Sequence, residues 1–274
     1  MKIAPVTVKA TEMLLVEEVS GEQWIANANW QHVVDAGDDR LSYLQSVARH
    51  RLHSDMEMTH KPPLMRDSRI FCVGKNYSDH ASEMGGAPPA FPDIFMRVPT
   101  SFVGHQQAII CPDGVTSLDY EGELAAIIGR EAKNVSAEHA LQYVMGYTIG
   151  NDGTVREWQK RTSQYTLGKN VDKSGALGPW ILLAGDGFDP QAQQIQTCVD
   201  TVIKQKGRTS SMIFSLATVI AFISRSMTLK PGDIIMTGTP SGVGAGQTPP
   251  AFLKSGNLVR IRVPSIGTLE NTIA

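Results

Sequence analysis

Residues 118–130 read LDYEGELAAIIGR, an apolar run entered through three acidic residues at alternate positions. The run LAAII predicts a buried β-strand. Side chains alternate between the two faces of a strand, so Asp119, Glu121 and Glu123 are expected to project on the same side. Because like charges repel and an unpaired buried carboxylate is costly, this arrangement needs a compensating charge.

A divalent metal ion is one source of that charge. A second strand-like run, GYTIGND, ends in Asp152, and Glu121 and Glu123 can converge on one point with it. Three carboxylates without a basic partner are best neutralised by a hard cation such as Mg²⁺, Mn²⁺ or Ca²⁺. The alternative is a solvated edge strand whose acids face water, which is common for an isolated Glu-x-Glu pattern. Asp119 lies at the start of the strand, where a turn or cap role suits it better than that of a ligand.

The composition is that of an ordinary globular protein. The chain has 274 residues, 42% hydrophobic and 19% charged, which suits one large domain or a large domain with a small appendage. A formal net charge of −2 gives no reason to expect a nucleic-acid or membrane partner. Three widely spaced cysteines without a CxxC pair argue against a disulfide framework. With no signal-like or membrane-spanning apolar segment, the sequence predicts a soluble, cytoplasmic protein.

Residues 1–65 differ from the rest and predict a small N-terminal domain, followed by a larger domain over residues 66–274. The first part combines short alternating stretches with a helix predicted from Asp38 to about His50. Beyond a proline-containing linker, short strand-like runs bounded by Gly and Pro are dense. Fewer helices are expected, near residues 77–84, 137–144, 154–161 and 214–227. The fold prediction is a β-rich α+β domain with an N-terminal appendage.

The stretch GKNYSDHASEMG, residues 74–85, joins a strand end to a short predicted helix. A Ser78 or Asp79 cap would place His80 and Glu83 three residues apart on one helix face. A carboxylate orients an imidazole and raises its basicity, so this pair is a candidate general base. The alternative is a surface ion pair of little energetic consequence.

Two further stretches carry candidate binding residues. Lys169 lies on a glycine-flanked loop, where a lysine stabilises developing negative charge, binds a carboxylate, or is simply solvated. The run MTGTPSGVG, residues 236–244, lacks P-loop spacing, although its backbone N–H groups and the Thr239 hydroxyl could hold a small anion. Arg156 and Gln159 are one helical turn apart and either contact a ligand or solvate a helix.

Six blocks, taken in order over residues 69–272, resemble the fumarylacetoacetate hydrolase family. They are KNYSDHASE, DYEGELAAIIGR, GYTIGNDGTVREWQ, LGKNVDKSGALGPW, FSLATVIAFISRSMTLKPGDIIMTGTPSGVG and PPAFLKSGNLVRIRVPSIGTLEN. Six ordered blocks are more specific than any single motif. The resemblance implies a core of mixed, rolled, barrel-like β-sheet, often behind a small N-terminal domain, and a homodimer.

The resemblance also implies roles for individual residues. It gives Glu121, Glu123 and Asp152 as the ligands of Mg²⁺ or Mn²⁺, with Ca²⁺ as a further option. It places a catalytic dyad of His80 and Glu83 on a mobile lid over the substrate.

The same resemblance places Lys169 near the metal and the developing enolate of the substrate. Thr239 would contact the substrate carboxylate or a metal-bound group, while Arg156 and Gln159 would line the pocket. Two blocks depart from the family: NDGTVREWQ stands where NDVSARDWQ is more usual, and GKNVDKSGALGPW stands where GKSFDTFAPLGPW is more usual. These departures spare the ligand set and leave the substrate open. Contact with a second substrate carboxylate is open to three basic residues: Lys75, Arg97 and Lys173.

The preferred function is metal-dependent hydrolysis of a carbon–carbon bond in an acylpyruvate, a 2,4-diketo acid, giving pyruvate and a carboxylic acid. His80, oriented by Glu83, would activate water, and the metal and Lys169 would stabilise the pyruvate enolate. Within the family, the alternatives are an oxaloacetate-type decarboxylase, an isomerase of acids such as 2-hydroxyhepta-2,4-diene-1,7-dioate, or a hydratase. A non-catalytic protein that binds small acids is the alternative from another class. In each case the partner is a small oxo acid.

Overall fold

The chain is described by a computed structural model covering residues 1–53, 55–85, 87–185 and 187–274. The strands are β1 (Lys2–Val8), β2 (Thr11–Glu17), β3 (Gln23–Ala26), β4 (Arg49–Arg51), β5 (Met58–His60), β6 (Ile70–Gly74), β7 (Asp93–Arg97), β8 (Phe102–Val103), β9 (Leu118–Asp119), β10 (Gly122–Ile128), β11 (Val144–Asn151), β12 (Thr154–Val155), β13 (Gly175–Leu183), β14 (Gln194–Val199), β15 (Val202–Arg208), β16 (Ile234–Met236), β17 (Leu258–Val263) and β18 (Gly267–Thr272). The helices are α1 (Trp30–Ala36), α2 (Arg40–Ser46), α3 (Ser78–Glu83), α4 (Arg156–Gln159), α5 (Thr166–Lys169) and α6 (Leu216–Ser226).

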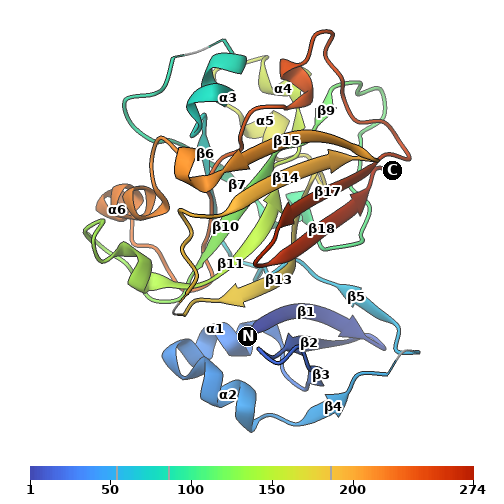
Figure 1. The fold of residues 1–274 in the computed structure, drawn as a ribbon, viewed down its shortest axis with the longest axis vertical. Helices are drawn as coiled ribbons and strands as arrows, with labels where there is room; N and C mark the ends of the chain where they lie inside the picture. Colours follow the sequence, from blue (N-terminus) through green and yellow to red (C-terminus); the bar gives the residue numbers. More distant parts are fainter. Residues whose placement is uncertain (54, 86, 186) are drawn as a thin grey trace.

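Two packed sheets make up most of the molecule (Figure 1). The larger, twelve-stranded sheet runs in the order β4-β3-β2-β1-β13-β11-β10-β16-β6-β7, with β5 beside β1 and β8 beside β13. Its pairings are mixed, since β6 runs parallel to β16 while β10 and β11 are antiparallel. The four-stranded sheet β15-β14-β17-β18 lies against β10, β11 and β13. The predicted β-rich α+β class is confirmed.

Strand β10 is buried along its whole length because both of its faces are covered. Leu124 and Ala126 join the core cluster shared with the four-stranded sheet. Ala125 and Ile127 join a second cluster, which includes Trp30 from the N-terminal region. A strand covered on both faces needs a continuous apolar run rather than alternation. The run LAAII therefore places β10 at the centre of the fold.

The single strand predicted over residues 118–130 is wrong at its beginning. Strand β9 pairs with β12 in a separate two-stranded sheet, and β10 begins only at Gly122. Asp119 and Glu123 therefore belong to different strands, and Glu121 lies in the connection between them. A Cβ at position 122 would collide with the Thr197 hydroxyl of the second sheet, so the close approach of the two sheets requires glycine here.

The helix predictions hold best where the apolar pattern is long. Helix α6 matches the prediction over residues 214–227, and α3 matches that near 77–84, although its N-cap is Tyr77 without a side-chain cap bond. The helix predicted from Asp38 to about His50 is wrong at its end, because α2 ends at Ser46 and Arg49–Arg51 form β4 against β3.

The shorter helices depend on tertiary contacts and were harder to predict. Helix α1 was not expected, although Asn29 forms a capping box with His32 at its start. Residues Ala140–Tyr143 form a 3₁₀ turn rather than an α-helix. Helix α5 stands where a loop was predicted around Lys169.

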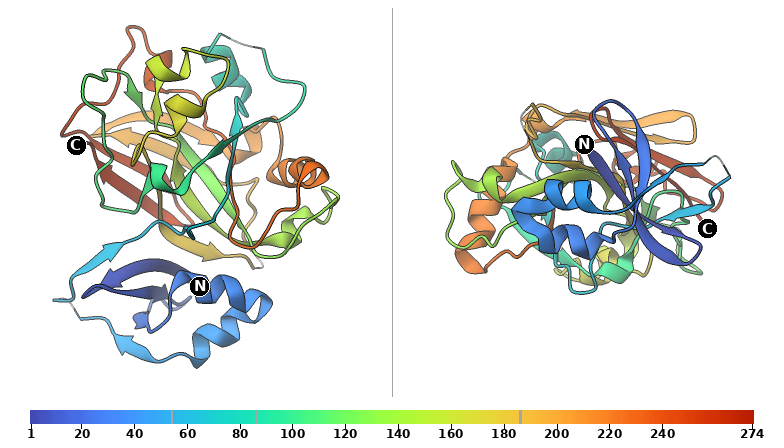
Figure 2. Two further views of the ribbon diagram at one scale, coloured as in Figure 1. Left: turned by 180° about the vertical axis from the view of Figure 1, so that it is seen from behind. Right: turned by 90° about the horizontal axis from the view of Figure 1, so that it is seen from below.

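Helices α3, α4 and α5 gather at the end of the molecule remote from β1–β5 (Figures 1 and 2). At the other end, β1 pairs with β13 and so joins the N-terminal strands to the large sheet. The domain boundary near residue 65 stays a prediction. In the part of the chain that the structure describes, no helix is long and apolar enough to cross a membrane.

Candidate active site

Three buried carboxylates converge beside the paired ends of β10 and β11. Oxygen atoms of Glu121, Glu123 and Asp152 all lie within 4.8 Å of one another. The register places Gly122 opposite Asn151, and the backbone N–H of Asp152 donates to the Glu121 carbonyl at 2.9 Å. The three acids grouped from the sequence are therefore brought together, and we call them the carboxylate triad.

The triad has basic partners, contrary to the expectation from the sequence. Lys169 Nζ lies 2.9 Å from Glu121 Oε2 and 2.6 Å from Asp152 Oδ2. Arg97 Nη1 lies 2.7 Å from the other oxygen of Asp152. Arg97 is thus committed to the triad and does not await a substrate carboxylate. Both cations come from elements distant in sequence, so the acidic pattern gave no sign of them.

Asp119 and Arg156 form a second buried pair beside the triad. Arg156 Nε donates to Asp119 Oδ2 at 2.8 Å, and its Nη2 lies 2.6 Å from Glu121 Oε1. Asp119 also accepts backbone N–H bonds from Gly244 and Ala245, at 2.7 and 3.0 Å. Asp119 therefore anchors Arg156 and the backbone at Gly244 and Ala245, and its non-ligand role stays a prediction.

The charges of this cluster leave one excess negative charge, because four carboxylates face three cations. Burial opposes ionisation of Glu121, but Lys169 and Arg156 outweigh it and lower the pKa of Glu121 to about 2. Burial favours the neutral amine of Lys169, yet the Asp152 and Glu121 carboxylates raise its pKa. Both groups therefore stay charged near neutral pH.

Glu123 is the exception within the triad. Its Oε2 accepts the backbone N–H of Gly238 at 2.8 Å, and it has no ion pair with any cation among the described residues. Burial, followed by the charges of Asp152 and Glu121, raises the pKa of Glu123 well above its ordinary value. An all-oxygen donor set with an undercompensated buried carboxylate fits a hard divalent cation such as Mg²⁺.

The predicted His80–Glu83 pair is present on α3. His80 Nδ1 lies 3.0 Å from Glu83 Oε2, and Glu83 Oε1 accepts the backbone N–H of Gly242 at 2.8 Å. Asp79 accepts from the backbone N–H of His80 and from the Ser241 hydroxyl, each at 2.8 Å. Ser241 and Gly242, within the run MTGTPSGVG, therefore fix the position of α3 and, through Glu83, the orientation of the imidazole.

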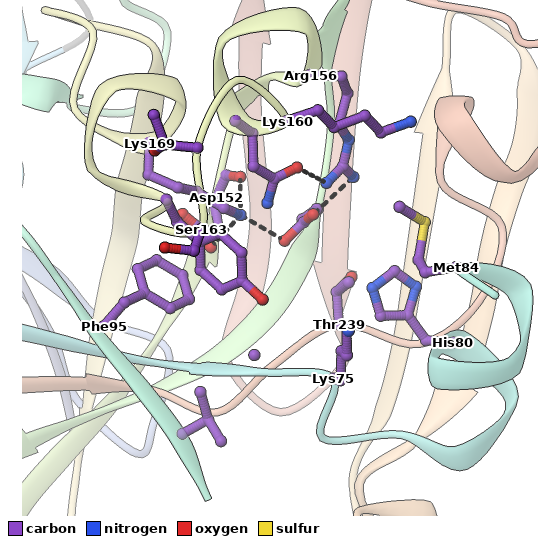
Figure 3. Close-up of a pocket in the computed structure, with 16 residues that line it drawn as sticks. Lys75, His80, Met84, Phe95, Asp152, Arg156, Lys160, Ser163, Lys169 and Thr239 are labelled. Carbon is purple, nitrogen blue, oxygen red and sulfur yellow. Dashed lines mark hydrogen bonds and ion pairs between the residues drawn. The ribbon is translucent and has the colours of Figure 1, made fainter. Parts of the chain in front are cut away.

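One cavity of about 380 Å³ joins the imidazole to the triad (Figure 3). In Figure 3, His80 and Met84 stand on one side of this space, and Asp152 and Lys169 stand on the other. The predicted site residues that line it are His80, Glu121, Asp152, Arg156, Gln159, Lys169 and Thr239. Glu83 supports His80, and Glu123 completes the triad.

The two polar side chains predicted to contact substrate are already bonded within the protein. Thr239 Oγ1 donates to the Gly122 carbonyl at 2.9 Å and accepts from Gln205 Nε2 at 2.7 Å. Gln159 Oε1 accepts from Arg156 Nη1 at 3.0 Å. Gln205 also accepts the Gly122 N–H at 2.9 Å, so it fixes the backbone between the two glutamates.

Gln205 and Lys160 were not anticipated. Gln205 lies on β15, 83 residues from Gly122, and no local pattern links the two. Lys160 follows REWQ directly and lines the cavity, so extending that motif by one residue would have found it. Lys173, a candidate for a substrate contact, is not among the residues that line the cavity.

Comparisons with known proteins bear on the whole chain. A family model described as "Fumarylacetoacetate (FAA) hydrolase C-terminal" matches residues 69–274. The chain is 40% identical over 259 residues to oxaloacetate tautomerase YisK of Bacillus subtilis, covering 92% of this chain and 83% of that protein. It is 36% identical over 236 residues to the human mitochondrial oxaloacetate tautomerase FAHD2A, covering 83% and 75%. A fumarylacetoacetate hydrolase structure from Exiguobacterium antarcticum superposes with a TM-score of 0.87 at 34% identity, covering 100% and 99%.

Proposed function

Because the chain belongs to the fumarylacetoacetate hydrolase family, we propose that it is a metal-dependent tautomerase of oxaloacetate or a closely related oxo acid. The observation that carries the proposal is a cavity lined by His80 together with two acids of the carboxylate triad, Glu121 and Asp152. The two relatives named as oxaloacetate tautomerases favour this isomerase-type alternative over acylpyruvate hydrolysis, which the sequence alone made the first choice.

Tautomerisation moves one proton between C3 and the oxygen on C2 and breaks no carbon–carbon bond. We assign His80 to proton transfer at C3, because it lines the cavity and Glu83 orients its ring at 3.0 Å. The Glu83 carboxylate also stabilises the imidazolium that forms when His80 holds the proton.

The triad would hold the metal ion, for which we propose Mg²⁺ or Mn²⁺, with Ca²⁺ as a further option. Such an ion supplies Lewis-acid polarisation of the 2-oxo group when it is bound. Lys169, which lines the cavity as a buried cation, adds positive charge beside the developing enolate oxygen.

Hydrolysis of an acylpyruvate is the second candidate, since the same dyad can activate a water molecule. The products separate the candidates: hydrolysis of an acylpyruvate releases pyruvate and a carboxylic acid, decarboxylation of oxaloacetate releases CO₂ and pyruvate, and tautomerisation releases none of these. The test follows the ultraviolet absorbance of enol-oxaloacetate with Mg²⁺ or Mn²⁺ present, alongside an assay for pyruvate. Accelerated loss of the enol without pyruvate supports the proposal, and pyruvate formed at the same rate contradicts it.

Replacement of the imidazole tests the role of the dyad. His80→Ala is expected to keep metal binding and to lower kcat by about 10²- to 10⁴-fold, the usual contribution of a positioned acid or base. His139→Ala is the matched control, because His139 is exposed and does not line the cavity. A near-normal kcat in His80→Ala would exclude the assigned role.

The family resemblance also leads us to propose a homodimer. Light scattering on the purified protein should then give twice the chain mass of 29.7 kDa. A particle of single-chain mass at working concentration would contradict this proposal.

A further inference from the structure

The cations around the cavity fall into two groups. The charged floor consists of the triad with Arg97, Arg156 and Lys169, and each of these cations is ion-paired. Arg97 and Glu123 belong to this buried cluster without lining the cavity. The cationic rim consists of Lys75 and Lys160, which line the same cavity. Neither rim lysine has an ion pair or a side-chain hydrogen bond with any residue that the structure describes.

The backbone of Lys75 is held in a costly conformation. Its φ of 53° lies in the left-handed region, which glycine tolerates and lysine disfavours. The next residue, Asn76, is fully buried and fixes the chain by donating to the Thr237 carbonyl at 2.7 Å and accepting from the Phe214 N–H at 2.8 Å. A non-glycine residue kept at such a position next to a reactive cavity suggests that its side chain is used.

Lys160 reaches the cavity from the opposite wall. Its backbone N–H donates to the Arg156 carbonyl at 3.1 Å at the end of α4. Figure 3 shows its ammonium group extending across the upper part of the cavity toward the side that bears His80 and Met84. Lys75 lies below Thr239 on that same side. The two rim lysines therefore line the cavity on the side of this view that bears His80, and neither has an ion pair with Asp152.

The acids of the cavity lining cannot satisfy these two charges. Glu121 and Asp152 are its only acidic members among the described residues, and both are bonded to Lys169. An apolar substrate tail would cover the ammonium groups without pairing them, which is unfavourable. A carboxylate would pair with them, and charge-assisted bonds are the strong ones.

We propose that Lys75 and Lys160 bind the carboxylate at the far end of a dicarboxylic 2-oxo acid. The other end of the substrate, its 1-carboxylate and 2-oxo group, would lie at the triad and its metal ion. This inference rests on the proposed function, which it deepens by naming the residues that recognise the second carboxylate of the substrate.

Binding of two stable acids tests the inference without turnover. Malate and lactate share the 2-hydroxy-carboxylate end, and only malate has a distal carboxylate. In the Mg²⁺-loaded protein, calorimetry should show malate bound more tightly than lactate. The variants Lys75→Met and Lys160→Met should each reduce that preference by about 10- to 100-fold, as expected for a lost hydrogen bond between charged groups.

Two further variants make the result decisive. Lys254→Met is the control, because Lys254 is exposed and does not line this cavity; it should keep the wild-type preference. Lys75→Gly relieves the left-handed backbone, so it should raise the Tm while losing the preference for malate. Equal binding of malate and lactate by the wild type, or an unchanged preference in both rim variants, would overturn the inference. A preference that behaves as expected without oxaloacetate tautomerisation would instead refute only the proposed function.

Discussion

The charged floor and the cationic rim border one cavity but follow opposite rules. On the floor, Lys169 bridges Glu121 and Asp152, and the buried charged groups other than Glu123 are ion-paired with one another. On the rim, Lys75 is half-buried and Lys160 is exposed, and neither is paired within the part of the chain that the structure describes.

This difference predicts that substitutions in the floor and in the rim will have different effects. A buried charge that loses its partner is strongly destabilising, so substitutions in the floor should cost stability. A half-exposed lysine can be replaced at little cost to folding, so the rim can change with the substrate. The floor should therefore respond to mutation in metal affinity and stability, whereas the rim should respond in ligand selectivity.

The largest effect is expected at Glu123, the undercompensated acid of the floor. Glu123→Gln keeps the shape but removes the charge, so metal affinity should fall by about 100-fold or more, and activity should fall with it. The apo protein should stay folded, because Glu123 is buried without an ion pair among the described residues, so removing its charge leaves no cation unpaired. Titration with Mn²⁺ measures the affinity.

The rim provides the comparison for this experiment. Lys160→Met should bind Mn²⁺ as the wild type does, since Lys160 has no ion pair with the triad. Wild-type affinity in Glu123→Gln, or lost affinity in Lys160→Met, would break the distinction between floor and rim.

Arg97 should give the next largest effect, seen as a loss of stability. Its guanidinium donates to Asp152, to Ser174 Oγ at 2.9 Å and to Ser101 Oγ at 3.2 Å, and it stacks 4.2 Å from the Phe102 ring centre. Arg97→Met should lower the free energy of unfolding by about 3 kcal/mol, because it leaves buried acceptors with one cation fewer. Urea denaturation measures the change.

A charge-preserving variant separates geometry from charge at the same position. Arg97→Lys keeps one positive charge but loses the planar fork that reaches Asp152 and Ser174 together. It should be intermediate in stability and should weaken Mn²⁺ binding by about 10-fold, as expected for a residue that orients a metal ligand. Wild-type stability and Mn²⁺ affinity in Arg97→Lys would show that only the positive charge at this position matters.

The sequence predicted the parts of the site that local patterns encode. The His80–Glu83 pair follows from a three-residue helical spacing, and β10 follows from a continuous apolar run. The grouping of Glu121 and Glu123 with Asp152 combined a short spacing with the end of the next strand. Each of these patterns needs only neighbouring strands or a single turn.

The parts that the sequence did not predict depend on distant contacts. Arg97 meets Asp152 across 55 residues, and Arg156 meets Asp119 across 37. Nothing in the single sequence pairs these residues, so the sequence predicts a triad without basic partners. The interruption of the strand between Asp119 and Gly122 also depends on the approach of another sheet.

Each of the two blocks that depart from the family contains one glycine that packing explains, Gly153 in the first and Gly175 in the second. A Cβ at Gly153 would collide with the Ser174 carbonyl, and a Cβ at Gly175 would lie 2.9 Å from the Arg97 guanidinium nitrogens. Glycine at 153 leaves room for the Ser174 carbonyl, and glycine at 175 leaves room for the Arg97 guanidinium. Gly153 and Gly175 therefore both depend on close packing in the segment beside Arg97.

Gly153→Ala tests that explanation and should destabilise the protein by about 1–3 kcal/mol, the usual cost of forcing an extra group into a packed core. Gly185→Ala is the control, because none of the described atoms lies within 4 Å of a Cβ built there. Thermal and urea unfolding compare the two. An unchanged free energy of unfolding in Gly153→Ala would mean that the 174–175 segment moves away at little cost and that close packing does not hold the floor in place.

The smallest expected effect is a change in the pH dependence of stability, which differs between His60, outside the charged floor, and Glu121, within it. Burial, followed by the nearby His105, lowers the pKa of His60 to about 4 from 6.5, and His60 Nδ1 has no hydrogen-bond partner within the described residues. Between pH 6.5 and 4, His60 is protonated in the unfolded chain but neutral in the folded chain. The free energy of unfolding therefore falls as the pH is lowered through this window. Glu121, with its pKa lowered to about 2 from 4.5, instead loses its contribution as the pH falls from 4.5 to 2. His60→Phe should recover about 1–2 kcal/mol between pH 6.5 and 4 and leave the lower window unchanged, as measured by urea unfolding at each pH. If the upper window persists in His60→Phe, the acid sensitivity there belongs to other groups.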